Sequence, residues 1–144
     1  MSLRGIATVI YLADDVAAAA AWYTELLGVQ PFFTRPGPGG RPIYAKFRIG
    51  ERQDELAIAD RAGAAPGTVT GPGGAIVHWR VDDVEETLAR LQAMGAQEHL
   101  PVTPHGPFVT AVVVDPFGNL LGVHGVLAVP HYVDATAPTT VRAN

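Results

Sequence analysis

Cysteine is absent from the 144 residues, which excludes disulfide bonds and thiolate metal sites. Any metal ion would therefore have to be bound by histidine and carboxylate side chains. No run approaches the roughly 18 uninterrupted apolar residues of a membrane-spanning helix. The chain also lacks a basic run, and its net charge is -4, so the electrostatic footprint of a nucleic-acid-binding protein is missing. We therefore expect neither a membrane nor a nucleic acid as a partner.

The remaining composition is that of a compact globular protein. Hydrophobic residues make up 48% of the chain and charged residues 17%, unlike the composition of a disordered chain. A chain of this length forms one domain, or two small modules with a common core, and buries about 70% of its unfolded surface. The apolar run 6–13 is followed at once by two aspartates, which favours a strand over a signal peptide. We expect a soluble, cytoplasmic protein.

The chain contains an internal repeat. The run Leu-Ala-Asp-Asp-Val at 12–16 returns as Arg-Val-Asp-Asp-Val at 80–84, and Leu-Gly-Val at 27–29 returns as Met-Gly-Ala at 94–96. Both pairs are separated by nearly the same number of residues. A repeat at a fixed spacing indicates two copies of one structural unit.

Each copy predicts the element order β-α-β-β-β. The Asp pairs can accept hydrogen bonds from the free N–H groups of a helix start, and the Ala- and Leu-rich segments that follow have good helix propensity. Gly28 and Gly95 then stand where a left-handed helix cap is needed. The predicted helices are 15–27 and 83–94, and the predicted strands are 6–13, 31–33, 43–49, 55–59, 75–81, 98–102, 108–114 and 120–123.

These elements divide the chain into four parts. The first module spans 4–60, a Gly- and Pro-rich connection spans 61–73, and the second module spans 74–126. The segment 127–144 has no clear periodicity. We interpret it as a C-terminal tail that is partly ordered around 130–132.

A turn near the end organises the second module. The residues Asp-Pro-Phe-Gly at 115–118 match the preferences of a type I turn, with Asp first, Pro second and Gly fourth. Apolar runs at 110–114 and 120–123 enter and leave this turn. The pattern predicts a hairpin whose strands are both largely buried.

Together with the helix motifs at 15–28 and 81–84, the stretch 115–125 resembles the vicinal oxygen chelate superfamily, which includes glyoxalases, bleomycin-resistance proteins and extradiol dioxygenases. The resemblance covers nearly the whole chain. It implies an α+β fold of two tandem βαβββ modules that form a curled mixed sheet around a shared cleft. It also implies a homodimer. Such a resemblance is informative about fold and says little about the reaction.

The resemblance also implies where a metal would bind. The four ligand positions of the metal-dependent relatives correspond here to Thr8, Glu55, Ile76 and Gly122. Of these only Glu55 is a competent ligand, and a catalytic divalent metal usually needs about three protein ligands. We therefore expect no cofactor at the usual position, which speaks against ordinary glyoxalase or dioxygenase chemistry.

Two histidines allow a different interpretation. His78 and His124 each lie two residues beyond a family ligand position, so strand alternation turns them toward the cleft, about 6–7 Å from the usual place. They could hold a divalent ion such as Zn, Fe, Ni or Mn together with Glu55, although the sequence offers no third ligand at the shifted level. Alternatively, they line a ligand pocket as hydrogen-bonding groups.

Strand alternation also predicts the rest of the cleft wall, and it places Trp79 and Val123 on the helix side. Arg80 and Lys46 could anchor a carboxylate, phenolate or phosphate, or either could pair with Glu55. Mostly apolar walls with a few convergent polar groups describe a small-molecule pocket. The predicted cleft residues are Thr8, Ile10, Tyr44, Lys46, Arg48, Glu55, His78, Arg80 and His124, with apolar Val109, Ala111 and Val113.

Three functions fit these observations. The first, which we favour, is a metal-independent binding protein of the bleomycin-resistance kind that sequesters a small organic molecule. The second is a metal-dependent lyase, isomerase or dioxygenase with an atypical site at His78 and His124. The third is a regulatory or accessory domain whose cleft has no catalytic role.

Overall fold

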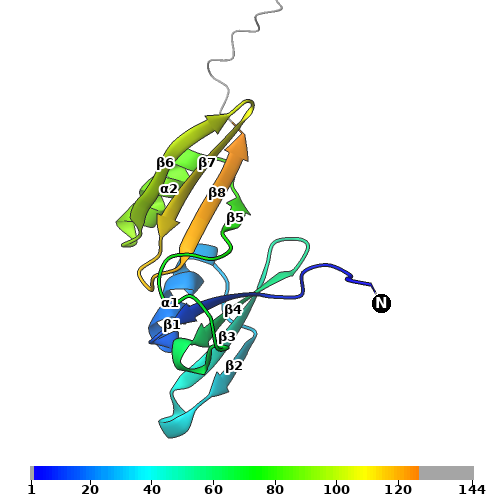
Figure 1. Cartoon of the computed structure of the whole chain (residues 1–144), viewed down its shortest axis with the longest axis vertical. Coiled ribbons are helices and arrows are strands. Elements are labelled where there is room, and N and C mark those ends of the chain that lie inside the picture. Colours follow the sequence, from blue (N-terminus) through cyan, green and yellow to red (C-terminus); the bar gives the residue numbers. More distant parts are fainter. Residues whose placement is uncertain (1, 127–144) are drawn as a thin grey trace, which may run out of the picture.

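The computed structural model describes residues 2–126, and these form two βαβββ modules in tandem (Figure 1). The fold class predicted from the sequence is confirmed. The first module consists of β1 (Val9–Ala13), α1 (Val16–Leu27), β2 (Phe33–Pro36), β3 (Pro42–Ile49) and β4 (Asp54–Asp60). The second consists of β5 (Val77–Arg80), α2 (Val84–Ala93), β6 (Gln97–His105), β7 (Phe108–Val114) and β8 (Leu120–Val126).

Both helices begin and end within one residue of the predicted bounds. The side chain of Asp15 accepts a hydrogen bond from the backbone N–H of Ala18 at 3.0 Å, and Asp83 accepts one from Glu86 at 2.9 Å. These bonds satisfy N–H groups that have no partner inside the helix. Gly28 ends α1 with a φ of 70°, a left-handed conformation that glycine adopts without strain.

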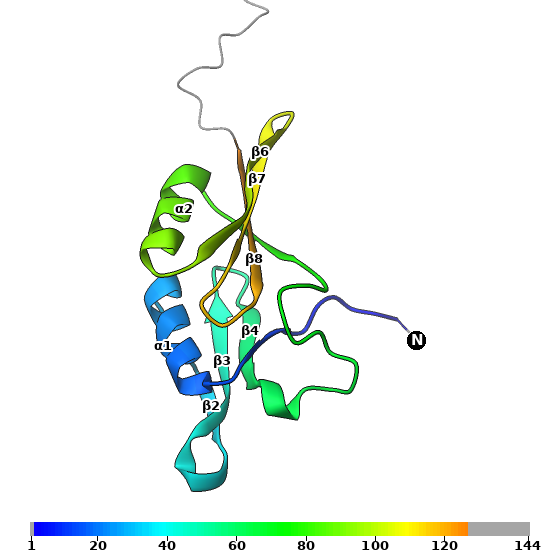
Figure 2. The same cartoon turned by 60° about the vertical axis from the view of Figure 1, so that its left-hand side comes forward.

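Each module has its own four-stranded sheet, in the orders β1-β4-β3-β2 and β5-β8-β7-β6. The pairs β1–β4 and β5–β8 are parallel, and the remaining pairs are antiparallel. The two sheets are separate and stand end to end (Figure 1). In the turned view both helices lie on one side of the molecule, and the segment that connects the modules lies on the other (Figure 2).

The helices cover one face of each sheet and bury the core there. Hydrophobic burial at roughly 25 cal/mol per Å² is the main stabilising term of such a layer. The largest fully buried side chains are Tyr23, Phe47, Leu56, Ile58, Leu91, Val113 and Val123.

The two modules are joined by polar contacts around the turn at 115–119. The hydroxyl of Tyr23 on α1 donates a hydrogen bond to the buried carboxylate of Asp115. The side-chain amide of Asn119 bonds to both backbone groups of Leu12, accepting from its N–H at 3.1 Å and donating to its carbonyl at 2.9 Å. Asn119 thus contacts the end of β1 much as a neighbouring strand would. The predicted hairpin turn is therefore also the junction between the modules.

One predicted part of the cleft wall is wrong. Val109, Ala111 and Val113 belong to the hydrophobic core on the helix side. The cause is the register of the hairpin, in which Thr110 pairs with His124 and Ala111 pairs with Val123. Paired residues of antiparallel strands share a face, so the even-numbered positions of β7 lie on the face of His124.

The edge strands also differ from the prediction. β6 runs to His105 rather than ending at 102, and β2 begins at Phe33 and includes Pro36. Both are outer strands of their sheets, where proline is tolerated. The predicted tail at 127–144, with the order expected around 130–132, lies outside the described residues.

Candidate functional site

On the first module, four polar side chains gather on the sheet face opposite the helix. Thr8 donates a hydrogen bond to a carboxylate oxygen of Glu55 at 3.2 Å. Lys46 forms an ion pair with the same oxygen, and the Nε of Arg48 lies 3.7 Å from the other. We name Thr8, Lys46, Arg48 and Glu55 the Glu55 group.

The charge of Glu55 is satisfied inside this group. Lys46 and Arg48 lie on β3, where Arg48 stands directly opposite Glu55 on β4. The hydrogen bond from Lys46, assisted by the one from Thr8, holds the pKa of Glu55 below its ordinary value. The carboxylate therefore stays ionised, and its oxygens are engaged by cations and a hydroxyl.

Aromatic side chains border the Glu55 group. The guanidinium of Arg48 lies 4.0 Å from the ring centre of Phe32. Further out, the guanidinium of Arg35 lies 5.5 Å from the ring centre of Tyr44, and the rings of Tyr44 and Phe33 are 6.2 Å apart. Cation–aromatic contacts of this kind hold the arginine side chains in place at the surface.

On the second module, the two histidines lie side by side. The ring centres of His78 and His124 are 6.5 Å apart with an angle of 84° between the planes, and the ring of Phe108 is 5.3 Å from that of His124. Arg80 is paired with His124 in the parallel register of β5 and β8. We name His78, Arg80, Phe108 and His124 the histidine group.

His78 occupies the space beside Gly122. A Cβ atom added to Gly122 would lie 2.7 Å from the Nδ1 of His78 and 2.8 Å from its Cγ, closer than carbon and nitrogen atoms pack. The imidazole therefore lies against the bare backbone of β8. Any longer side chain at position 122, including a metal-binding carboxylate, would require His78 to move.

The alternation predicted along β5 and β8 is confirmed. Val123 is buried and Trp79 packs against the core, whereas His78 and Arg80 are exposed. The indole of Trp79 donates a hydrogen bond to the hydroxyl of Tyr11 at 3.2 Å. The expectation that His78 and Arg80 bind a ligand stays a prediction.

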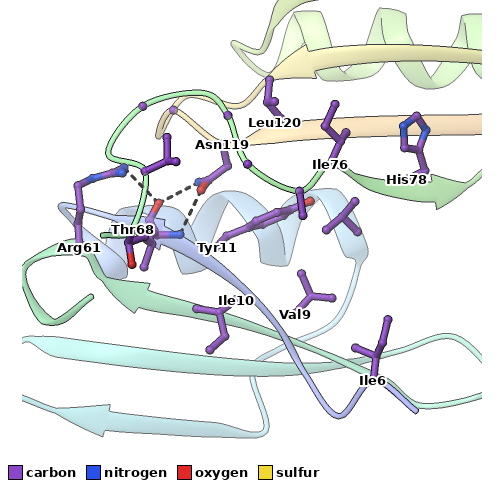
Figure 3. Close-up of a pocket in the computed structure, with 18 residues that line it drawn as sticks. Ile6, Val9, Ile10, Tyr11, Arg61, Thr68, Ile76, His78, Asn119 and Leu120 are labelled. Carbon is purple, nitrogen blue, oxygen red and sulfur yellow. Dashed lines mark hydrogen bonds between the residues drawn. The ribbon is translucent and has the colours of Figure 1, made fainter. Parts of the chain in front are cut away.

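A cavity of about 670 Å³ lies between the modules, beside β1, β5 and the connecting segment (Figure 3). Its apolar wall includes Ile10 and Ile76, and His78 lies at one end. Arg61 and Asn119 also line it, but their polar atoms are used internally. The guanidinium of Arg61 donates to the carbonyls of Thr70, Leu12 and Phe117 and contacts the carboxylate of Asp14.

Two smaller cavities lie beside the second module. One of about 300 Å³ is lined by Arg80, Phe108 and His124 together with Asp82 and Val126. The other, of about 360 Å³, lies between the helices and is lined mostly by apolar side chains.

The structure brings the predicted site residues together in two groups rather than one. Thr8, Lys46 and Glu55 are in contact, and the rings of His78, His124 and Phe108 lie beside one another. Arg80 stands next to His124 in register and lines the same cavity. None of the three cavities is lined by a member of the Glu55 group. Phe108 was not among the predicted site residues, because the odd-numbered rather than the even-numbered residues of β7 were expected on the face of His124.

The side chains at the family metal position do not fit a divalent ion. Within residues 2–126, no group of three or more histidine and acidic side chains could hold a metal ion. The carboxylate of Glu55 is already paired with cations, and the place of a ligand on residue 122 is filled by the ring of His78.

The family model of the glyoxalase/bleomycin resistance protein/dioxygenase superfamily matches residues 5–123. The chain belongs to this superfamily. The family resemblance drawn from the three sequence motifs is thereby confirmed. No curated protein sequence matches the chain significantly. Among the described residues no helix is long and apolar enough to cross a membrane.

Several solved structures share the fold at low identity. Protein ATC0852 from Agrobacterium tumefaciens is 25% identical, with a TM-score of 0.71 and coverage of 88% of this chain and 100% of that chain. A glyoxalase-related enzyme from Fulvimarina pelagi is 24% identical, with a TM-score of 0.64 and coverage of 85% and 88%. The fosfomycin resistance protein FosX from Listeria monocytogenes, solved with Mn(II), is 15% identical, with a TM-score of 0.64 and coverage of 88% and 94%. These likenesses concern the fold, and the chemistry has to be argued from the site.

Proposed function

We propose that this superfamily member binds a small organic molecule without a metal ion, in the manner of a bleomycin-resistance protein. One observation carries the proposal: the imidazole of His78 fills the space over Gly122 where a metal ligand would project. The ion-paired state of Glu55 supports it from the other module. The sheet faces that carry the Glu55 group and the histidine group offer cations, imidazoles and aromatic rings. Such side chains suit recognition of a small molecule by hydrogen bonding and stacking. A cytoplasmic location stays a prediction.

We further propose that the binding pocket is completed by a second copy of the chain. Of the three cavities found within residues 2–126, none is lined by both the Glu55 group and the histidine group. The sheet faces also leave large apolar side chains exposed, among them Ile10 at 55%, Phe33 at 48% and Phe108 at 45%. In a twofold dimer the first module of each chain can face the second module of its partner, which covers both faces with two equal contacts.

Ligand binding is tested by thermal unfolding in EDTA with a panel of small aromatic and apolar molecules. A ligand that binds only the native state raises Tm, and the rise grows with the logarithm of the ratio of its concentration to its Kd. We expect such ligands in the absence of metal. Their effect should weaken in His124→Ala and persist in Arg52→Gln, which alters an exposed turn residue. Stabilisation that requires added metal would contradict the proposal.

The composite pocket is tested by mixing two defective variants. Lys46→Gln alters the Glu55 group and His124→Ala alters the histidine group. If each pocket uses one module from each chain, a mixed dimer contains one intact pocket, so binding returns after the variants are exchanged. If each pocket lies within one chain, the mixture stays defective. Sedimentation equilibrium that shows a monomer would also contradict the proposal.

A second candidate rests on the proximity of His78 and His124, whose ring centres are 6.5 Å apart. With Glu55 as third ligand this pair would hold a divalent ion and support a lyase, isomerase or dioxygenase. It requires Glu55 to exchange Lys46 and Arg48 for the metal. Metal retention that depends on both histidines would favour this candidate.

A further inference from the structure

We propose that the ligand is a small carboxylic acid with a flat apolar body, and that Arg80 binds its carboxylate in the cavity of about 300 Å³ at the end of β5 and β8. This inference rests on the proposed binding function and specifies the ligand of the same site. It separates two cations that the sequence alone left equivalent, Lys46 and Arg80.

The ion pairs distinguish these cations. Lys46 pairs with Glu55, and Arg48 both approaches Glu55 and covers the ring of Phe32. In the described part of the chain Arg80 has no ion pair, although its side chain lines a cavity. A guanidinium next to a cavity binds a carboxylate through two parallel N–H···O bonds, which fixes the orientation of the ligand.

The walls of the cavity determine the body of the ligand. His124 stands beside Arg80 in register, and the ring of Phe108 lies 5.3 Å from the imidazole at an angle of 50°. Phe108 is 45% exposed and Val126 is 56% exposed, so both present apolar surface that a bound ring would cover. A flat ligand can stack against these rings with its carboxylate directed at Arg80.

The size of the cavity and the charge of its lining restrict the class of ligand further. About 300 Å³ is at the lower end of small-molecule pockets. Asp82 lines the same cavity, and its carboxylate repels a second negative charge on the ligand. A monoanion such as a carboxylate is therefore favoured over a phosphate or phosphonate dianion.

The test uses three probes that differ only in their head group: benzoate, benzamide and phenylphosphonate. Each is titrated into the ¹⁵N-labelled full chain in EDTA while amide shifts are followed. We expect benzoate to shift the amides of Arg80, His124 and Gly125, and to bind at least about tenfold more tightly than benzamide, as the loss of one ion pair implies. Phenylphosphonate should bind more weakly than benzoate.

Substitutions of Arg80 test where the carboxylate of benzoate binds. Arg80→Gln should weaken benzoate about tenfold and leave benzamide unchanged, Arg80→Lys should retain part of the affinity, and Arg52→Gln should behave as the native chain. Dispersed amide spectra verify that each variant is folded. Failure of benzoate to bind both in EDTA and with added manganese, equal binding of benzamide, or shifts centred on Arg48 and Phe32 would overturn the inference. Benzoate binding that needs added manganese but still depends on Arg80 would overturn the metal-independent function and leave the inference standing.

Discussion

The hydroxyl of Tyr23 donates a hydrogen bond to the carboxylate of Asp115, which lies 92 residues further along the chain and is buried. This bond connects the helix of the first module to the turn of the second. The same carboxylate accepts the backbone N–H groups of Phe117 and Asn119. The turn is therefore held in shape by Asp115 and held to the first module by Tyr23.

Removing the Tyr23 hydroxyl should destabilise the whole chain. Tyr23→Phe leaves the buried Asp115 with one partner fewer, at a cost of about 1–3 kcal/mol in the free energy of unfolding. Urea unfolding measures it. The matched control is Tyr44→Phe, because the Tyr44 hydroxyl has no hydrogen bond among the described residues; its effect should stay within about 0.5 kcal/mol. Equal effects of the two substitutions would contradict this role.

Alkaline pH should destabilise the junction between the two modules, because it favours ionisation of Tyr11. Burial raises the pKa of Tyr11 from the ordinary 10.0 to about 12. Below pH 10.0 both folded and unfolded states keep the proton, so the stability contribution is fully present. As pH rises from 10.0 to about 12 the unfolded state ionises first, and about 2–3 kcal/mol is lost. The free energy of unfolding measured across this range should fall less steeply in Tyr11→Phe than in the native chain. Parallel slopes would show that Tyr11 is not the cause.

The ionisation of Glu55 should depend on Lys46. The hydrogen bond from Lys46 lowers the pKa of Glu55, so this contribution to stability is present above the unfolded carboxyl pKa and is lost as pH falls through the lower folded value. In Lys46→Gln the carboxyl should titrate at higher pH than in the native chain. Carbon-13 shifts of the Glu55 carboxyl report it directly. Arg52→Gln serves as control, and an unchanged titration in Lys46→Gln would refute the pairing.

His78 and Gly122 should be energetically coupled. Gly122→Ala brings a Cβ to within 2.7–2.8 Å of the imidazole, and such overpacking costs about 1–3 kcal/mol. The cost should largely disappear in a His78→Ala background, which gives a coupling energy of about 0.5–3 kcal/mol in a double-mutant cycle. Urea unfolding of the four proteins measures it. Additive effects would mean that the ring of His78 does not lie over Gly122.

Local signals were sufficient to predict the helices. Asp15, Asp83 and Gly28 act on backbone groups within a few residues of themselves, so their effect can be recognised in the sequence alone. The end of β6 was missed because Pro101 and Pro104 interrupt its pattern, and only its outer position in the sheet makes them acceptable.

The face on which a site residue lies could be predicted from alternation along its own strand. Which residues of a neighbouring strand share that face was harder to predict. Alternation placed His78 and Arg80 on one face correctly, but the face of β7 depends on the pairing of Thr110 with His124. A register shift of one residue turns every side chain of a strand to the other face of the sheet. The contact between Asn119 and Leu12 spans 107 residues, and no local pattern specifies it. Likewise, only the three-dimensional structure shows that Lys46 is paired and that the ring of His78 covers Gly122.

Metal retention tests the central claim most directly. The chain is equilibrated in turn with zinc, iron(II), nickel and manganese, dialysed, and analysed for bound metal, alongside His78→Ala and His124→Ala. Because the ring of His78 fills the space over Gly122 and Glu55 is ion-paired, we predict that the native chain retains no more metal than the two variants. Stoichiometric retention by the native chain that is abolished in both variants would contradict it and establish a metal site at the histidines.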